Sequence, residues 1–135
     1  MALSSPEGAA ALNRLIHPLV IDLQQQILDE RERSAGDGIA VVEAALLIES
    51  GGKSRFDRIV VVDSDPEVQL QRAEARGLPR EEAELRMSRQ LDRARRLEAA
   101  HYVISNSADL AALEEQTRKV FDVLRADLLE KKRLR

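Results

Sequence analysis

Apolar residues recur at helical spacing near both ends of the chain, and they form short uninterrupted runs in the middle. Leucine and isoleucine positions three and four residues apart predict helix over residues 5–33, either as two helices or as one helix kinked at Pro18. Ser5 and Pro6 are typical of a helix start, because serine can cap free amides and proline fits the first helical position. A second stripe predicts a final helix over residues 109–132.

Three short apolar runs between these helices predict strands. The run at 58–62 has no polar alternation, which is the pattern of a strand covered on both faces, and 39–42 and 102–104 are further runs rich in β-branched residues. Polar helices are expected over 66–76 and over about 80–98. Strands that alternate with helices indicate an α/β fold with a parallel sheet, here in a single domain.

The predicted polar helix over 80–98 carries the clearest candidate for binding chemistry. On an ideal helix Arg86, Arg89, Arg93 and Arg96 fall within about 80° of one another, opposite an apolar stripe. Planar guanidinium groups suit phosphate oxygens, and a movable cationic helix can close over a nucleotide polyphosphate. A solvated helix face, partly neutralised by neighbouring acids, explains the same pattern equally well.

Composition narrows the classes of function. The 135 residues are 44% hydrophobic and 33% charged and contain no cysteine, which fits one compact domain and excludes disulfides and thiolate chemistry. Residues 72–96 hold eight arginines against five acids, whereas the whole chain has a net charge of −3 and three aromatic residues. A nucleic-acid partner is therefore disfavoured. No apolar run has membrane length and no targeting signal is visible, so a cytoplasmic protein without a membrane partner is expected.

Other polar residues are weaker candidates. Gly51-Gly52-Lys53-Ser54 matches the tail of a phosphate-binding loop, but the motif requires glycine at position 47, which is leucine here, and this favours an ordinary glycine-rich loop. His17 and His101 have no recognisable catalytic partners nearby in sequence, which favours structural roles. Glu49 follows an apolar run, near the strand end at which open α/β sheets bind ligands.

Several motifs occur in the order and spacing of one enzyme family over residues 5–123. The first two motifs are residues 12–20, which contain a His-Pro pair, and the acidic segment of residues 42–49. The third is residues 58–63 together with the following Pro66 to Arg72. The fourth is Gln90 with Arg93 and Arg96, and the fifth is residues 102–106. Together they resemble the dephospho-CoA kinase family, P-loop kinases that add the 3′-phosphate in the last step of coenzyme A synthesis. The sequence departs from the family pattern at Ala45, which replaces proline, and at His101, which replaces aspartate.

The resemblance implies a P-loop-kinase-like parallel sheet with flanking helices and an arginine-rich lid helix. Residues 1–33 would be helices on the dephospho-CoA side, 39–76 the core, 77–98 the lid, and 99–135 the last strand and helix. The implied partners are dephospho-CoA and ATP, with magnesium in the complete family enzyme. The implied site residues are Arg72, Arg93, Arg96 and Asn106 for ATP and the lid, and His17 and Glu49 for the dephospho-CoA side.

The family's phosphate loop and catalytic aspartate have no match in these 135 residues, and Met1 aligns after them. We therefore assign no catalytic or metal-binding residue, and expect a sheet without its first strands and no turnover by this chain alone. A missing central strand predicts that strands 39–42 and 58–62 either close on each other or expose edges that promote self-association. The alternative is a non-catalytic helical interaction or regulatory module derived from the same family.

Overall fold

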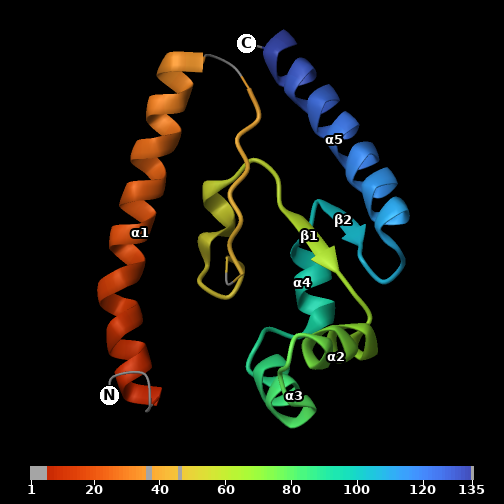
Figure 1. The fold of residues 1–135 in the computed structure, drawn as a ribbon. Coiled ribbons are helices and arrows are strands. Elements are labelled where there is room, and N and C mark those ends of the chain that lie inside the picture. Colours follow the sequence, from red (N-terminus) through yellow and green to blue (C-terminus); the bar gives the residue numbers. More distant parts are fainter. Residues whose placement is uncertain (1–5, 36–37, 46, 135) are drawn as a thin grey trace. The chain divides into compact units, whose positions relative to one another are not determined.

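The computed structural model describes residues 6–35, 38–45 and 47–134 (Figure 1). The chain divides into two compact units, Met1–Val41 and Val42–Arg135. Among the described helices, none is long and apolar enough to cross a membrane.

The first unit is built on one helix, α1, which spans Pro6–Ala35 and includes Pro18. Of the two forms predicted for this region, the structure has the single helix; the predicted cap, Ser5, lies outside the described residues. Arg33 lies in the last turn, where its charge complements the helix dipole, and its Nε donates to the Asp29 carbonyl at 3.1 Å. The apolar stripe of α1 is exposed, with 70% of Leu15 accessible.

The prediction of a strand over residues 39–42 is wrong. These residues form no ladder, and Val41 is 85% exposed. Their β-branched side chains favour extended backbone, but a strand also needs a neighbour that pairs its amides and carbonyls, and none pairs with them in the part of the chain that is described.

The second unit contains a two-stranded parallel sheet of β1, Val60–Asp63, and β2, Tyr102–Ser105. The register pairs Val60 with Tyr102 and Asp63 with Ser105. The expected parallel sheet is confirmed, but the sequence had not predicted that these two runs pair with each other. The expectation that the run at 58–62 is covered on both faces is wrong, because Val62 is 60% exposed. The run is apolar throughout, yet its side chains alternate between more and less exposed positions.

Two short helices pack together after β1. They are α2, Pro66–Ala75, and α3, Arg80–Ser88, and their contact buries a small cluster of Leu70, Ala73 and Ala83 with Leu78 and Met87 against it. The α2 helix ends in a Schellman motif: the Gly77 amide donates to the Glu74 carbonyl at 2.9 Å and the Leu78 amide to the Ala73 carbonyl at 3.0 Å. Gly77 supplies the positive φ of 85° that this turn requires.

The prediction of a single helix over residues 80–98 is wrong. The structure has two helices there, α3 and a short α4, Arg93–Ala99, separated by residues 89–92. Asp92 explains the break: its Oδ1 accepts the Ala94 amide at 2.8 Å, which starts a new helix. The predicted single face of four arginines therefore does not exist.

The last helix, α5, spans Leu110–Arg133 and confirms the predicted C-terminal helix, with Asp109 accepting the Ala112 amide at 2.9 Å as its cap. Asp127 fastens α5 to the sheet, since its Oδ2 accepts the Tyr102 hydroxyl at 2.8 Å and Arg58 Nε at 2.6 Å. These donors hold the pKa of Asp127 below its ordinary value, Tyr102 more than Arg58.

Candidate functional site

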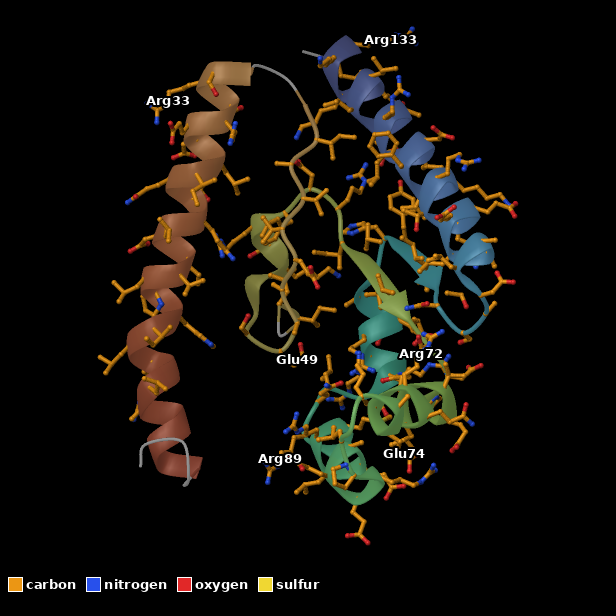
Figure 2. The ribbon with its side chains drawn as sticks, in the orientation of Figure 1. Arg33, Glu49, Arg72, Glu74, Arg89 and Arg133 are labelled. Atoms are coloured by element: carbon orange, nitrogen blue, oxygen red, sulfur yellow. The ribbon has the colours of Figure 1, made fainter. Side chains whose placement is uncertain are left out.

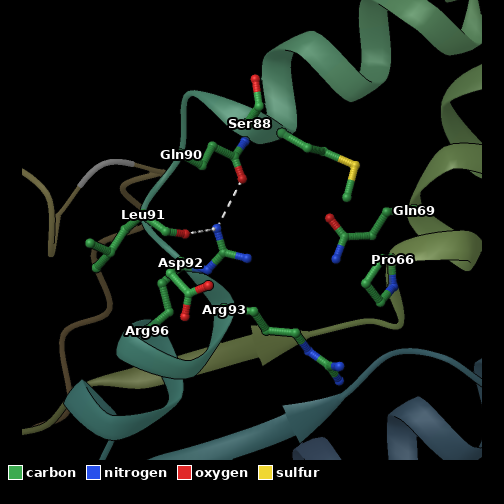
Figure 3. A pocket seen from close by; sticks show the side chains of 9 residues that line it. Pro66, Gln69, Ser88, Gln90, Leu91, Asp92, Arg93 and Arg96 are labelled. Carbon is green, nitrogen blue, oxygen red and sulfur yellow. Dashed lines mark hydrogen bonds between the residues drawn. The ribbon is translucent and has the colours of Figure 1, made fainter.

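A cavity of about 290 Å³ lies between the amino end of α2, the carboxyl end of α3, and α4 (Figure 3). This volume is close to that of the smaller ligand sites in proteins, roughly 300 Å³. Its walls come from two helix ends, the turn between α3 and α4, and α4 itself: Pro66, Gln69, Met87, Ser88, Gln90, Leu91, Asp92, Arg93 and Arg96.

Arg93 joins this cavity to the carboxyl end of β1. Its Nε and Nη2 donate to the two carboxylate oxygens of Asp63 at 2.9 and 2.6 Å, and Nη2 lies 3.3 Å from Asp65 Oδ1. The Asp63 side chain is only 13% exposed. This two-pronged ion pair holds the pKa of Asp63 below its usual value and raises the pKa of Arg93. The pair therefore keeps both groups charged and fixes α4 against β1.

Arg96 has neutral partners instead. Its Nη1 donates to Gln90 Oε1 and to the Leu91 carbonyl, both at 3.0 Å, and Figure 3 shows its guanidinium reaching these groups from α4. In the described part of the chain, no carboxylate forms an ion pair with Arg96. Arg96 thus brings a positive charge to the cavity that no direct ion pair neutralises.

Arg72 and Asn106 meet where β1 and β2 end. Arg72 Nη1 donates to the Asn106 carbonyl at 2.6 Å and Nη2 to the Ala108 carbonyl at 3.3 Å. Ser64 Oγ donates to the same Asn106 carbonyl at 2.9 Å, and the Asn106 amide donates to the Asp63 carbonyl at 2.6 Å. The carboxyl ends of parallel strands are where open α/β sheets bind ligands.

Other arginines of the segment are bound to surface acids. Arg80 forms a two-pronged pair with Glu67, with a shortest distance of 2.7 Å, and Arg86 Nη2 lies 2.6 Å from Glu82 Oε1. Figure 2 shows Arg89 beside α3, well apart from Arg72 beside α2. For Arg86, which pairs with Glu82, the structure supports the alternative of a solvated helix face partly neutralised by acids.

The two residues expected on the dephospho-CoA side belong to different units. Glu49 lies in the second unit, where its Oε1 accepts the Leu91 amide at 3.3 Å and so contacts the turn that lines the cavity. His17 lies on α1 in the first unit with an exposed side chain.

The glycine-rich segment that follows Glu49 does not have the structure of a phosphate-binding loop. Gly52–Arg55 forms a single 3₁₀ turn, which lacks the loop-to-α-helix geometry of that motif.

The sequence patterns gave no role to Asp63 and named no bonding partner for the ring of His101. Asp63 follows a strand directly, and the rule that places ligand sites at strand ends could have singled it out. His101 Nδ1 accepts the Ile59 amide at 2.8 Å, next to the first residue pair of the sheet. This bond supports the structural role that the sequence favoured for His101, and it lets histidine stand where the resemblance has aspartate, since both side chains can accept an amide.

The sequence model of one enzyme family, dephospho-CoA kinase, matches residues 1–112, which is more than half of the 135 residues. The chain belongs to the dephospho-CoA kinase family. The resemblance based on five groups of motifs is thereby confirmed.

Relatives and a solved structure agree with this assignment. The chain is 43% identical over 123 residues to a dephospho-CoA kinase of Chlorobaculum tepidum, covering 90% of this chain and 58% of that protein. It is 38% identical over 116 residues to a dephospho-CoA kinase of Nitrobacter winogradskyi, and this match covers 83% of this chain and 58% of that protein. A dephospho-CoA kinase structure from Campylobacter jejuni matches with a TM-score of 0.57 and 26% identity, over 90% of this chain and 60% of that one. The chain spans about three fifths of the length of these dephospho-CoA kinases.

These similarities confirm the expected fold class of the family, a P-loop-kinase type of parallel α/β sheet with flanking helices. The described residues contain no group of three or more His, Asp or Glu side chains that could hold a metal ion. We assign no magnesium ligand among these residues.

Proposed function

We propose that this chain serves the ATP-dependent phosphorylation of dephospho-CoA by supplying the lid and part of the phosphate-binding surface. In that reaction the 3′-hydroxyl oxygen of dephospho-CoA bonds to the γ-phosphorus of ATP. The bond from the γ-phosphorus to the β-phosphate oxygen breaks, the hydroxyl proton leaves, and coenzyme A and ADP result. Phosphoryl transfer depends on positioning and on cations near the phosphate oxygens.

One observation carries the proposal: in a chain of this family, three arginines gather around the strand ends and the adjoining cavity. Arg72 is held there by two carbonyls, and Arg93 and Arg96 line the cavity from α4. A guanidinium group presents a planar fork of donors that matches phosphate oxygens. The same residues are those to which the family resemblance gives ATP and lid roles.

The 135 residues also limit what the chain does by itself. None of its six glycines stands in Gly-x-x-x-x-Gly-Lys-Ser spacing, and the catalytic aspartate of the family has no counterpart here. Without a cradle of backbone amides for the β- and γ-phosphates, the transferred group is poorly held. We expect these residues to bind nucleotide without steady turnover.

The test is an assay of the purified chain with ATP, magnesium and dephospho-CoA, following coenzyme A by mass spectrometry. We expect ATP binding without turnover, and turnover after addition of the part of the Chlorobaculum tepidum relative that this chain does not match. Steady turnover by the chain alone would contradict the limit stated above. A chain that binds neither ATP nor dephospho-CoA would contradict the proposal itself.

A matched pair of variants tests the residues. Arg72→Gln removes the cation at the strand ends, whereas Arg125→Gln removes an exposed arginine from α5. Arg72→Gln is expected to weaken ATP binding by about 1 to 3 kcal/mol, the usual contribution of a charge-assisted hydrogen bond, and Arg125→Gln should leave it unchanged. Equal titration curves for the two variants would remove Arg72 from the site.

A further inference from the structure

The amino ends of β1 and β2 are joined around Ile59, the residue immediately before β1. The Ile59 carbonyl accepts the amides of His101 and Tyr102 at 2.8 and 3.2 Å. The Ile59 amide donates in return to Nδ1 of the His101 ring at 2.8 Å. We call these bonds between Ile59 and residues 101–102 the Ile59–His101 clamp. It lies at the other end of the strands from Asp63 and Asn106, so it is separate from the candidate site.

The His101 ring is the member of the clamp that can change its charge near neutral pH. A ring nitrogen that accepts a hydrogen bond carries no proton, so the neutral ring holds its proton on Nε2. Uptake of a second proton at Nδ1 turns this acceptor into a donor. Two N–H groups would then face each other across the 2.8 Å contact, and the ring has to leave the Ile59 amide.

The Ile59 amide is poorly placed to find another acceptor. Ile59 is only 4% exposed, and a buried backbone amide without a partner costs free energy comparable to a lost hydrogen bond. The ladder of β1 and β2 begins at the next residue, with the pair of Val60 and Tyr102, and has four residue pairs. His101 itself is exposed, which gives its ring access to protons from solvent. Loss of the ring contact therefore loosens one end of a short sheet.

The acid that acts on the ring from α5 is Asp127. Its carboxylate accepts the Tyr102 hydroxyl at 2.8 Å and Arg58 Nε at 2.6 Å. These two donors, with a smaller contribution from a charge on His101, hold the pKa of Asp127 below its ordinary value. Because Arg58 brings the opposite charge to the same carboxylate, it partly cancels the attraction of Asp127 for a protonated ring.

The acids that come from the chain on either side of the clamp are exposed to solvent. Asp57, two residues before Ile59, pairs with Lys131 of α5 and has 74% of its side chain exposed. Glu98 of α4 is exposed as well. Solvent and salt screen such charges. Neither they nor Asp127 can restore a lone pair to Nδ1 once the ring is protonated, so the loss of the acceptor decides the outcome.

We propose that the Ile59–His101 clamp is a pH-sensitive device, closed by the neutral His101 ring and opened when that ring takes up a proton on acidification from about pH 8 to pH 5. The chain has two histidines and no cysteine, so His17 is the other side chain whose ordinary charge change falls in this range. The inference goes beyond the proposed function and does not rest on it, because no ligand takes part in it.

The direction of the effect follows from the number of protons bound. As the pH falls through the ordinary histidine range, the ring in the unfolded chain binds a proton that the closed clamp excludes. The unfolded state then holds more protons than the folded state, so the fold is most stable above this range and loses stability as the pH falls through it. Carboxylates ordinarily titrate at lower pH, which separates their effects from that of His101.

The experiment measures urea unfolding of the full chain from pH 8 to pH 5, followed by the fluorescence of Tyr102, the only tyrosine in a chain without tryptophan. His101→Asn is the decisive variant, because asparagine Oδ1 is as many bonds from Cα as histidine Nδ1, can accept the Ile59 amide, and does not titrate. His17→Gln is the matched control, since it removes the other histidine, which lies exposed on α1.

The folding equilibrium constants of the wild-type chain and of His17→Gln should fall about tenfold over this range, the contribution of about one hydrogen bond. That of His101→Asn should change by less than about twofold, which is the error of additivity for independent sites. A wild-type chain whose stability does not depend on pH overturns the proposal. A flat profile in His17→Gln, or a wild-type slope in His101→Asn, also overturns it.

A measurement on the wild-type chain covers the case in which His101→Asn does not fold. NMR of the isotope-labelled chain should find the ring proton of His101 on Nε2 at pH 8. On further acidification the Ile59 amide signal should shift with the same midpoint as the His101 ring, with the His17 ring as an internal reference. A proton on Nδ1 at pH 8, or a His101 ring that titrates while the Ile59 amide signal stays in place, overturns the proposal.

Discussion

Gly77 shows how one residue determines the local structure around the cavity. Its positive φ closes the Schellman motif after α2 and turns the chain so that Leu78 packs against the cluster of Leu70, Ala73 and Ala83. No atom lies within 4 Å of the position that a Cβ would occupy at Gly77. The requirement for glycine here is therefore one of backbone conformation, not of space.

Gly77→Ala is expected to destabilise the second unit by about 1 to 2 kcal/mol, the cost of a left-handed backbone for a residue with a Cβ. The measurement is the free energy of unfolding in urea. Gly38→Ala is the control, since Gly38 has open space around its Cβ position and no positive φ. Equal destabilisation by the two substitutions would contradict this account of Gly77.

Asp63 makes the free energy of unfolding depend on pH. Its pKa in the folded chain lies below the ordinary value of 3.8, chiefly because Arg93 donates to its carboxylate. A group whose pKa is lowered by folding stabilises the fold above its unfolded pKa, and this contribution is lost as the pH falls through the folded value. Wild-type stability should therefore decline on acidification around and below pH 3.8.

Asp63→Asn should unfold at lower urea concentration near neutral pH and should lose less further stability on acidification. Urea midpoints measured across this pH range test the expectation. Asp122→Asn, which changes an exposed carboxylate on α5, should follow the wild-type profile. A wild-type slope in Asp63→Asn would show that the ion pair with Arg93 does not contribute to the acid dependence.

Among the elements, α5 depends on polar contacts with the sheet region. Asp127 accepts from both Tyr102 and Arg58, and Lys131 Nζ lies 2.5 Å from Asp57 Oδ1 at the next turn of the helix. The exposed Lys131 pair contributes little, because solvent screens it. Asp127, which joins two donors from different strand regions, carries more of the attachment.

Asp127→Asn should lower the urea midpoint of the second unit more than Tyr102→Phe, because it weakens both bonds where Tyr102→Phe removes one. Lys131→Gln should have the smallest effect. Helix content followed by circular dichroism, together with the urea midpoints, gives this order. A larger loss in Lys131→Gln than in Asp127→Asn would reverse the account of how α5 is attached.

The elements also show what sequence patterns could predict. Periodicity and caps located the two long helices. The apolar runs that became β1 and β2 were also located, and the alternation of strands and helices predicted a parallel sheet, but not that these two runs pair with each other. The strand expected over 39–42 failed because a ladder needs a partner that local propensity does not supply. The helix expected over 80–98 failed because Asp92 competes as a cap in the middle of a polar stretch.

The same limits apply to the site. Family motifs identified Arg72, Arg93, Arg96 and Asn106 as candidates. The partners of Arg72 and Arg93, however, lie 34 and 30 residues away along the chain. Helical spacing grouped Arg93 with Arg86, whereas the structure pairs Arg93 with Asp63 and Arg86 with Glu82. The ion-pair partner of each arginine therefore depends on the tertiary structure and could not be deduced from spacing along one predicted helix.

At the scale of the whole molecule, the sheet raises the question of association. Within the described residues, β1 pairs only with β2, and Val60, Val62 and Val103 are 37%, 60% and 44% exposed. A strand edge with unpaired backbone groups and apolar neighbours is a template for pairing with another chain. The chain is therefore expected to self-associate as its concentration rises.

Val62→Lys should reduce this association, because a charged side chain on an edge strand opposes pairing between chains. Sedimentation velocity over a range of concentrations measures the effect, and Val123→Lys, which changes an exposed valine on α5, is the control. A wild-type chain that stays monomeric throughout would contradict the expectation, as would equal effects of the two substitutions.

The constant spacing of contacts across the sheet has a kinetic consequence. The bonds from Ile59 to His101, Ser64 to Asn106 and Asp65 to Ser107 each close 42 residues of chain. Helices α2, α3 and α4 lie inside that span, so forming them first shortens the effective loop and lowers the entropy lost when the strands meet. Gly77→Ala should therefore slow refolding, whereas Asp127→Asn, which acts outside the span, should mainly accelerate unfolding; stopped-flow measurements of both rates distinguish these effects.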